Sequence, residues 1–439
     1  MATQAGRRIR LKGNYMRTST LLRSGGVILA ILVASPVLAE DPPAAAPAPA
    51  ATPAAPTPFI KFSGHAEIGM TAKATDSART LNWGHLFTDR STEPLVNQVV
   101  LTAQHDIDSS SKTANWGFKV QGMWGSDARY THTLGILNNA TDNINQFDIV
   151  EAHVDVHLPI IASGGVDVKA GIYPTLEGVE LIDATGNFFY SHNYIFNFGI
   201  PLKHTGIMTT THFSHGIDIY LGVDSGVNTS FGTGGDTNGA AAFHGGIGFT
   251  IGKNVTVLAT THIGPENPRG SIGNYNKALR YLNDVAITWK ISPKLTSSTD
   301  INYIRDDGFH VAGGGISEQL VYAQSDAVSW GVRAEVWSDG DGFFVAAFPG
   351  NHDFVAVEKG SANTAIFAPA GGTTYGAVTV GVNFKPKVPA ITKNFSVLLR
   401  PEVRYDASLG SSRPFGLDAT NTGTKKDQLT LGIDAIFGF

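Results

Sequence analysis

The sequence contains no cysteine and no long apolar run, and charged residues make up only 16% of its 439 residues. The absence of cysteine excludes the disulfide framework on which small exported domains depend. No stretch reaches the 18 or so consecutive apolar residues of a transmembrane helix, which excludes a helical membrane protein. Glycine is abundant, with 50 residues, and aromatic residues account for 10%. This composition suits tight turns, a lipid-facing surface and aromatic rings at a membrane interface.

The first 39 residues have the three parts of a secretory signal peptide. Basic residues are followed by an apolar core over residues 27–34 and by the small-residue exit Val37-Leu38-Ala39, so we expect cleavage after Ala39. Met1 and Met16 are both candidate starts, because the segment from Met16 already has a basic head and an apolar core. Cleavage leaves 26 basic and 37 acidic residues, a formal net charge of −11. Nucleic acid is therefore not an expected partner.

Residues 40–58 are almost entirely proline, alanine and threonine. Such a segment cannot bury a core, and we expect a semi-rigid periplasmic linker. The remaining domain, residues 59–439, consists of short strand-like runs separated by connectors.

The final run, residues 427–439, alternates strictly between two faces. Gln428, Thr430, Gly432 and Asp434 lie on one face, and the other carries Leu429, Leu431, Ile433, Ala435, Phe437 and Phe439. A lipid-facing barrel strand has this pattern, and a soluble sandwich strand can share it. The export signal favours the membrane barrel.

The connectors alternate between long and short, which is typical of outer-membrane barrels with both ends in the periplasm. We count about sixteen strands, within a range of 14 to 18, in an all-β, antiparallel transmembrane barrel. The count includes Phe343–Phe348 as a strand, takes Asp306–Asp326 as a long external loop and Ser338–Gly342 as a short turn. Ala72–Pro94, between the first two strands, is interpreted as a long polar loop.

Charged residues gather on one face of several strands, which predicts a wet lumen. Placing them against lipid costs several kcal/mol each near the midplane. The candidate pore-lining residues on strands are Glu151, Asp155, Asp167, Lys169, Arg400, Glu402, Arg404 and Asp406. Candidates for aromatic anchoring at the membrane interface are Trp289, Tyr405, Phe437 and Phe439. A barrel of this size leaves an aqueous channel unless something plugs it, and we expect no plug domain.

Two segments are similar to a known family. Asn187–Ile207 is an aromatic-rich stretch that runs into a proline and then His204-Thr205-Gly206, and Leu399–Asp406 forms the penultimate strand. These segments resemble the β-barrel porin-2 (OmpL-like) family over residues 59–439. The resemblance implies an outer-membrane barrel with porin activity, inserted by the barrel-assembly machinery among outer-membrane lipids. It specifies neither the solute nor the oligomeric state, so a homo-oligomer remains one alternative.

The sequence gives little support for an enzyme or a metal site. It has no Gly-x-Ser-x-Gly elbow, His-Glu-x-x-His motif or phosphate-binding loop. His153 and His157 lie about 13 Å apart on one strand and cannot share an ion. We therefore expect no cofactor, no metal and no catalytic residue. A porin for small hydrophilic solutes or ions is the leading hypothesis; the alternatives are an adhesive or structural barrel and an enzyme at the barrel rim.

The third external loop, Pro174–Pro201, is the candidate constriction. It is acidic at its start, with Glu177, Glu180 and Asp183, and aromatic later. A free loop would expose a large apolar patch, so we expect it to fold inward. Its acids would then face a basic wall of Arg400 and Arg404, joined by Lys169. The alternative is that these charges only pair with one another across strands. The net acidity predicts a weak preference for cations.

Overall fold

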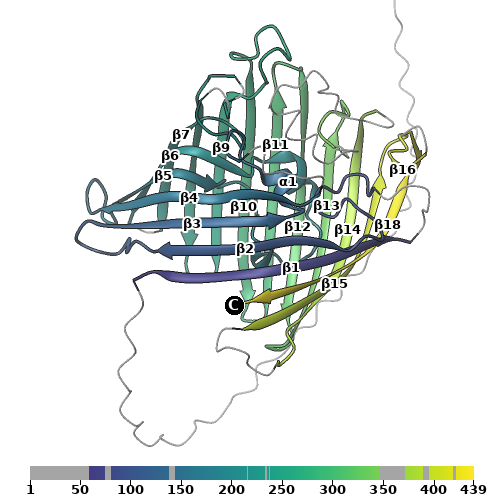
Figure 1. The fold of residues 1–439 in the computed structure, drawn as a ribbon, viewed down its shortest axis with the longest axis horizontal. Coiled ribbons are helices and arrows are strands. Elements are labelled where there is room, and N and C mark those ends of the chain that lie inside the picture. Colours follow the sequence, from purple (N-terminus) through teal and green to yellow (C-terminus); the bar gives the residue numbers. More distant parts are fainter. Residues whose placement is uncertain are drawn as a thin grey trace, which may run out of the picture. The chain divides into compact units, whose positions relative to one another are not determined.

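The computed structural model describes residues 59–74, 81–137, 144–214, 216–232, 235–236, 238–345, 371–388, 395–418 and 422–439. Within these residues, sixteen antiparallel strands close into one barrel, and β16 and β17 form a separate hairpin (Figure 1). The strands are β1 (Lys61–Lys73), β2 (Leu95–His105), β3 (Asn115–Gly125), β4 (Gln146–Leu158), β5 (Val166–Pro174), β6 (Lys203–Phe213), β7 (Ile217–Asp224), β8 (Ala242–Ile251), β9 (Val255–Pro265), β10 (Leu279–Ser292), β11 (Leu295–Asp306), β12 (Val311–Ala323), β13 (Val328–Asp339), β14 (Thr373–Phe384), β15 (Ser396–Ser408), β16 (Phe415–Leu417), β17 (Gly423–Lys425) and β18 (Asp427–Gly438). The expected signal peptide and linker, residues 1–58, lie outside the described residues.

The last strand closes the sheet, as its alternation predicted. β18 pairs with β15 on one side and with β1 on the other, and Figure 1 shows the yellow β18 beside the purple β1. Gly64 and Phe439 exchange two backbone hydrogen bonds of 3.1 and 3.0 Å. Along β18, Thr430 and Asp434 are buried inside the barrel, whereas Leu431 and Ile433 are exposed outside. Every strand edge of the barrel is therefore paired, as a spanning sheet requires.

The connectors divide the barrel into two ends. The turn end holds both ends of the barrel chain and the short connectors 106–114, 159–165, 214–216, 252–254, 293–294, 324–327 and 385–395. The loop end holds the longer connectors, including 74–94, 126–145 and 175–202. The predicted alternation is therefore correct, with one exception at residues 307–310, where β11 turns tightly into β12.

Two expectations about the strands were wrong. The region taken as the loop Asp306–Asp326 contains β12, which pairs with β11 over residues 311–322 and with β13 over residues 314–323. Phe343–Val345 is not a strand, and the apolar side chains of Phe344 and Val345 are buried within a loop. Residues 346–348 lie outside the described residues. Residues 340–342 consequently begin a long loop at the loop end instead of forming a periplasmic turn. The predicted number of about sixteen strands is nevertheless correct, because one strand was missed and one was added.

Helical segments are short and lie in the connectors. They are α1 (Ala128–Thr131), the 3₁₀ turn η1 (Ala184–Gly186) and the π-helical turn η2 (Ile195–Gly199). In the described part of the chain, no helix has the length and apolar character needed to cross a bilayer.

An apolar core fills part of the barrel interior near the loop end. Trp83 and Phe87, from the connector after β1, are buried together with Tyr130, Tyr194 and Phe196. The ring of Phe87 lies 5.2 Å from that of Tyr130 and 5.4 Å from that of Phe196, measured between centroids. The interpretation of residues 72–94 as a polar loop was wrong, because their aromatic residues are part of this core.

Candidate functional site

The third connector of the loop end, residues 175–202, lies along the inner face of the barrel. Its backbone is hydrogen-bonded to inward-facing side chains of β10 and β11. Gly178 N donates to Asp284 at 3.0 Å, and Val179 N donates to Asp300 at 3.2 Å. Asn302 Nδ2 donates to Gly199 O at 2.7 Å. We call residues 175–202 the inner loop.

Three buried arginines hold the inner loop by its carbonyl groups. Arg400 Nη1 donates to the carbonyl oxygens of residues 184 and 187, both at 2.9 Å. Arg404 Nη1 donates to His192 O at 2.9 Å, and Arg333 Nη1 donates to Ser191 O at 2.7 Å. A guanidinium group has five N–H donors and no acceptor, so it can bind a carbonyl and a carboxylate at once.

Two further carboxylates, on β13 and β15, bind amide groups of the same loop. Glu402 accepts hydrogen bonds from Tyr190 N at 2.9 Å and Ser191 N at 3.1 Å. Glu335 accepts a hydrogen bond from Tyr194 N at 2.6 Å. Together with the arginines, these side chains of β13 and β15 form what we call the anchor wall.

Arginines of the anchor wall also pair with carboxylates of the barrel strands. Arg400 lies 2.7 Å from Asp434 and 2.8 Å from Glu67, on the two neighbouring strands β18 and β1. Arg404 lies 2.8 Å from Asp406 and 2.9 Å from Glu335. Pairing across strands, the alternative considered from the sequence, therefore occurs together with binding to the loop. Because these side chains are buried beneath the loop, their effect on a solute would act through the position of the loop.

Glycines of the wall make room for the aromatic residues of the inner loop. A Cβ atom added at Gly331 would lie 2.2 Å from Phe188, and one added at Gly69 would lie 2.4 Å from Tyr190. At Gly381 the nearest atoms, on Phe189, are 3.1 Å away. The aromatic cluster that the sequence predicted to turn inward is thus seated on wall positions that have no side chain.

The three predicted acids of the inner loop have different surroundings. Glu180 is bonded to Arg333 at 2.6 Å and to His192 at 2.9 Å. Burial acts to raise the pKa of Glu180, but Arg333 and His192 outweigh it and hold this pKa at about 2. Burial raises the pKa of Glu177 to about 8, and neither of its carboxylate oxygens has a hydrogen-bond partner within the described residues. Asp183 accepts from Thr185 N at 2.9 Å and caps η1.

These positions differ from the expected arrangement of acids facing Arg400 and Arg404. Among the loop acids, Glu180 has an arginine partner, and that arginine is Arg333. The other two arginines bind the loop backbone and carboxylates of the wall. Lys169 does not join them, because it lies on β5 and is paired with Asp155 at 2.8 Å.

The remaining predicted pore residues, Glu151, Asp155, Asp167 and Lys169, lie on β4 and β5. Together with Lys119, His153, His157, His212 and Asp218, which pair with them or with one another, they form what we call the charged wall. Glu151 pairs with Lys119, and Asp167 lies 2.6 Å from His157 and 3.0 Å from His212. Unlike the arginines of the anchor wall, the charged wall keeps contact with solvent: the side chains of Lys119 and Lys169 are 30% and 36% exposed. The lumen thus has one wall covered by the inner loop and one that remains wet.

Several residues of this site were not among the sequence candidates. Arg333 and Glu335 alternate with apolar residues along β13, a signal equal to that of Arg400 and Glu402. Asp434 was placed on the inner face of β18, yet its pairing with Arg400 depends on the register between β15 and β18. The contribution of Glu67 and of the wall glycines depends on side chains far away in sequence, for which the chain gives no local signal.

The predicted membrane anchors lie on the outer surface or at the closure of the sheet. Trp289, Tyr405 and Phe439 are exposed, and Phe437 is partly buried. The ring of Phe439 lies over Gly64, where an added Cβ would be 2.7 Å away. Their role as anchors remains a prediction.

Comparisons with solved structures give outer-membrane channels with the same fold. An anion-selective porin from Comamonas acidovorans aligns with a TM-score of 0.53 at 11% identity, covering 87% of this chain and 99% of the other. The outer membrane channel DcaP of Acinetobacter baumannii and OmpF of Salmonella typhi each align with a TM-score of 0.51 at 10% identity, covering 87% of this chain and 97% of theirs. No curated protein matches the sequence.

The sequence itself identifies the family. Residues 59–439, the whole barrel, match the family described as "Putative beta-barrel porin-2, OmpL-like". The chain belongs to this family and is an outer-membrane diffusion channel with a porin fold.

Proposed function

We propose that this porin is a narrow channel for small hydrophilic solutes or ions, and that its constriction lies between the inner loop and the charged wall. The observation that carries the proposal is the asymmetry of the lumen. Arg333, Arg400, Arg404 and Glu402 hold the loop on one wall, whereas Lys169 and its neighbours on the other wall remain exposed to solvent. A fixed loop facing a wet wall limits the width of the passage without closing it.

The charged wall favours a weak preference for cations. Its acids outnumber its lysines: Glu151, Asp155, Asp167 and Asp218 stand against Lys119 and Lys169. A narrow, low-dielectric passage focuses the field of such groups, and the net acidity of the mature chain acts in the same direction. The acids are closely paired with these lysines and also with His153 and His212, each of which contacts two of them, and this pairing keeps the preference weak.

Planar-bilayer recordings across a salt gradient test both parts. We expect stable open channels and a reversal potential of the sign given by cation selectivity. Clear anion selectivity at low salt would contradict the charge assignment. The absence of conductance from correctly folded barrels would instead favour an adhesive or structural role, and hydrolysis or modification of an envelope component by the barrel would favour an enzyme.

The envelope route proposed from the sequence is export with cleavage after Ala39, followed by insertion by the barrel-assembly machinery into outer-membrane lipids. Membership of the porin family supports the destination. N-terminal sequencing of protein from purified outer membranes tests the cleavage, for which we expect a mature chain that begins at Glu40. A mature chain with a different first residue would contradict cleavage after Ala39.

A polar patch on the outer surface supports a homo-oligomer. The side chain of Glu318 belongs to the outward row of β12, between the exposed Ile316 and Leu320. It accepts hydrogen bonds from Ser297 and Thr299 of β11. Tyr322 faces outward near the turn end of β12. Glu318 lies four residues, or about 13 Å, further along the strand from that end, well inside the spanning part of the sheet. A carboxylate at such a depth is costly against lipid, and a neighbouring copy with polar groups would remove that cost.

A groove beside this patch supports the same interface. It has a volume of about 510 Å³ and is lined by residues of β8–β11, among them Gly245, Ala259, Ile301 and the polar Thr261 and Asn283. Asn283 accepts a hydrogen bond from Thr261 at 2.9 Å within it. We propose that the outer face of β8–β12 packs against a second copy of the barrel.

Light scattering of the detergent-solubilised protein tests this interface. We expect Glu318→Leu to convert the oligomer into monomers and Val154→Leu, on the exposed outer face of β4, to leave it intact. An oligomer that survives Glu318→Leu, together with higher thermal stability of the variant, would place this face against lipid instead.

A further inference from the structure

Three histidines and an aspartate meet at the loop ends of four consecutive strands. His204 is the second residue of β6, Asp224 ends β7, His244 lies near the start of β8 and His262 lies near the end of β9. The antiparallel register brings them together on the inner face: Gly206 is opposite Asp224, Gly222 is opposite His244, and His244 is opposite His262. The ring centroid of His204 lies 4.4 Å from that of His244 and 4.7 Å from that of His262.

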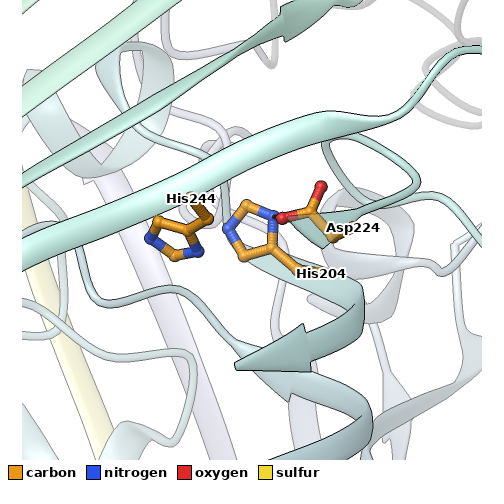
Figure 2. A group of neighbouring side chains, drawn as sticks. All are labelled: His204, Asp224 and His244. Atoms are coloured by element: carbon orange, nitrogen blue, oxygen red, sulfur yellow. Dashed lines mark ion pairs between the residues drawn. The ribbon is translucent and has the colours of Figure 1, made fainter. Parts of the chain in front are cut away.

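Figure 2 shows the ring of His204 between the ring of His244 and the carboxylate of Asp224. One ligand atom from each of these three residues lies within 4.8 Å of the others. Tetrahedral ligands at zinc-like distances are separated by about 3.4 Å. Small side-chain rotations would therefore bring the three atoms around one ion.

The hydrogen bonds leave the correct atom of each ligand available. His204 Nε2 lies 3.2 Å from Thr175 Oγ1, which leaves Nδ1 facing Asp224. Asp224 Oδ1 accepts from Gly226 N at 2.8 Å and contacts His262 Nε2 at 3.0 Å, and Oδ2 remains. His204 Nδ1 and Asp224 Oδ2 lie 3.2 Å from each other, and within the described residues neither atom has another partner. Outer partners of this kind fix the tautomer and orientation of metal ligands.

His244 provides the independent observation. Its side chain is 0% exposed, and in the described part of the chain neither ring nitrogen has a hydrogen-bond partner. A buried imidazole with two unsatisfied nitrogens is costly unless something binds one of them. The His244 ring packs against that of His204, and one of its nitrogens lies within 4.8 Å of ligand atoms of His204 and Asp224.

We propose that His204, Asp224 and His244 bind a first-row divalent transition metal ion such as Zn²⁺. Two imidazoles and one carboxylate are the donor set of such ions, whereas Ca²⁺ and Mg²⁺ take oxygen ligands. The fourth position belongs to a water molecule, and His262 holds Asp224 in place from behind. Sequence spacing does not reveal the site, because its three ligands come from three different strands.

Zinc binding to the refolded mature barrel in detergent tests the proposal. Because the ligands are buried, Zn²⁺ is present during refolding, and the protein is then desalted and titrated against a chromogenic chelator. We expect one equivalent of bound Zn²⁺, with His244→Phe weakening the affinity about 100-fold or more. The matched control is His153→Phe, since His153 is also a buried, inward-facing strand histidine beside carboxylates, and we expect it to bind like the wild type.

Wild-type protein that retains no stoichiometric Zn²⁺ overturns the site, as does His244→Phe with unchanged affinity. The cobalt spectrum of the wild type gives a second readout that needs no variant. An intense visible band of tetrahedral Co²⁺ supports the site, and the weak spectrum of hydrated, octahedral Co²⁺ rejects it. Heat-modifiable gel migration verifies that each variant is folded.

Discussion

Glu402→Gln should loosen the inner loop without changing the size of any side chain. The Glu402 carboxylate accepts two backbone N–H groups, from residues 190 and 191, at 2.9 and 3.1 Å. Glutamine keeps one acceptor oxygen, but its amide group faces the second N–H with another donor. Hydrogen bonds to charged groups contribute about 1.5–3 kcal/mol each, so the substitution should cost the attached state about 2 kcal/mol.

A loss of about 2 kcal/mol raises the population of the detached loop about 30-fold. Single-channel recordings should detect it as more frequent steps to a higher conductance and as greater open-channel noise. Arg400→Ala is a poorer test, because it leaves Glu67 and Asp434 buried without their arginine. Loss of one partner from a buried pair costs about 3–5 kcal/mol and could unfold the barrel wall.

Glu151→Gln is the matched control for Glu402→Gln. Glu151 is also a buried lumen glutamate, but it pairs with Lys119 and His153 on the charged wall. It should alter ion selectivity slightly and leave the frequency of conductance steps unchanged. Recordings of Glu402→Gln that match the wild type in noise and mean conductance would refute the anchoring role, as would an equal effect of Glu151→Gln.

Deletion of residues 177–196 should raise the single-channel conductance severalfold, because it removes the inner loop; an unchanged current would mean that the loop does not limit the passage. Deletion of residues 429–439 should abolish heat-modifiable gel migration, since each unpaired backbone group in lipid costs several kcal/mol; a retained fast-migrating form would contradict this closure. Glu177→Gln should flatten the pH dependence of stability in urea unfolding. The folded pKa of Glu177, about 8, exceeds its ordinary value of 4.5, so the folded state binds the proton more tightly and stability falls between these pH values by up to about 1.4 kcal/mol per unit. Equal pH profiles for variant and wild type would refute the assignment. The charged and titratable groups around Glu177 are Asp224, His262, Asp284 and Asp300.

The barrel was predictable from sequence wherever strands alternate strictly. β12 escaped because Gly313, Gly314 and Gly315 interrupt the alternation and Glu318 occupies an outward position where an apolar residue is expected. Phe343–Phe348 was taken for a strand because its residues are mostly apolar. Burial within a loop, as at Phe344 and Val345, produces the same apolar pattern as contact with lipid. Local periodicity cannot distinguish these two environments.

The candidate site was predictable only in part. The aromatic residues of the inner loop gave a strong signal, since they cannot remain in water, and Arg400 and Arg404 were identified by their alternation with apolar residues. Their partners were not, because pairing depends on register and on the path of the loop. The histidine cluster gave no signal, since His204, Asp224 and His244 are about 20 residues apart and meet only through two strand pairings, β6 with β7 and β7 with β8.

The anchor wall recognises the main chain of the inner loop. Arg333, Arg400 and Arg404 bind its carbonyl groups, and Glu335 and Glu402 bind its amides. Every amino acid supplies the same carbonyl, and every one except proline supplies the same amide. The wall therefore encodes the route of the loop, and the loop side chains that face the passage are free to vary. Relatives that retain the five wall residues could accept different solutes through one unchanged scaffold.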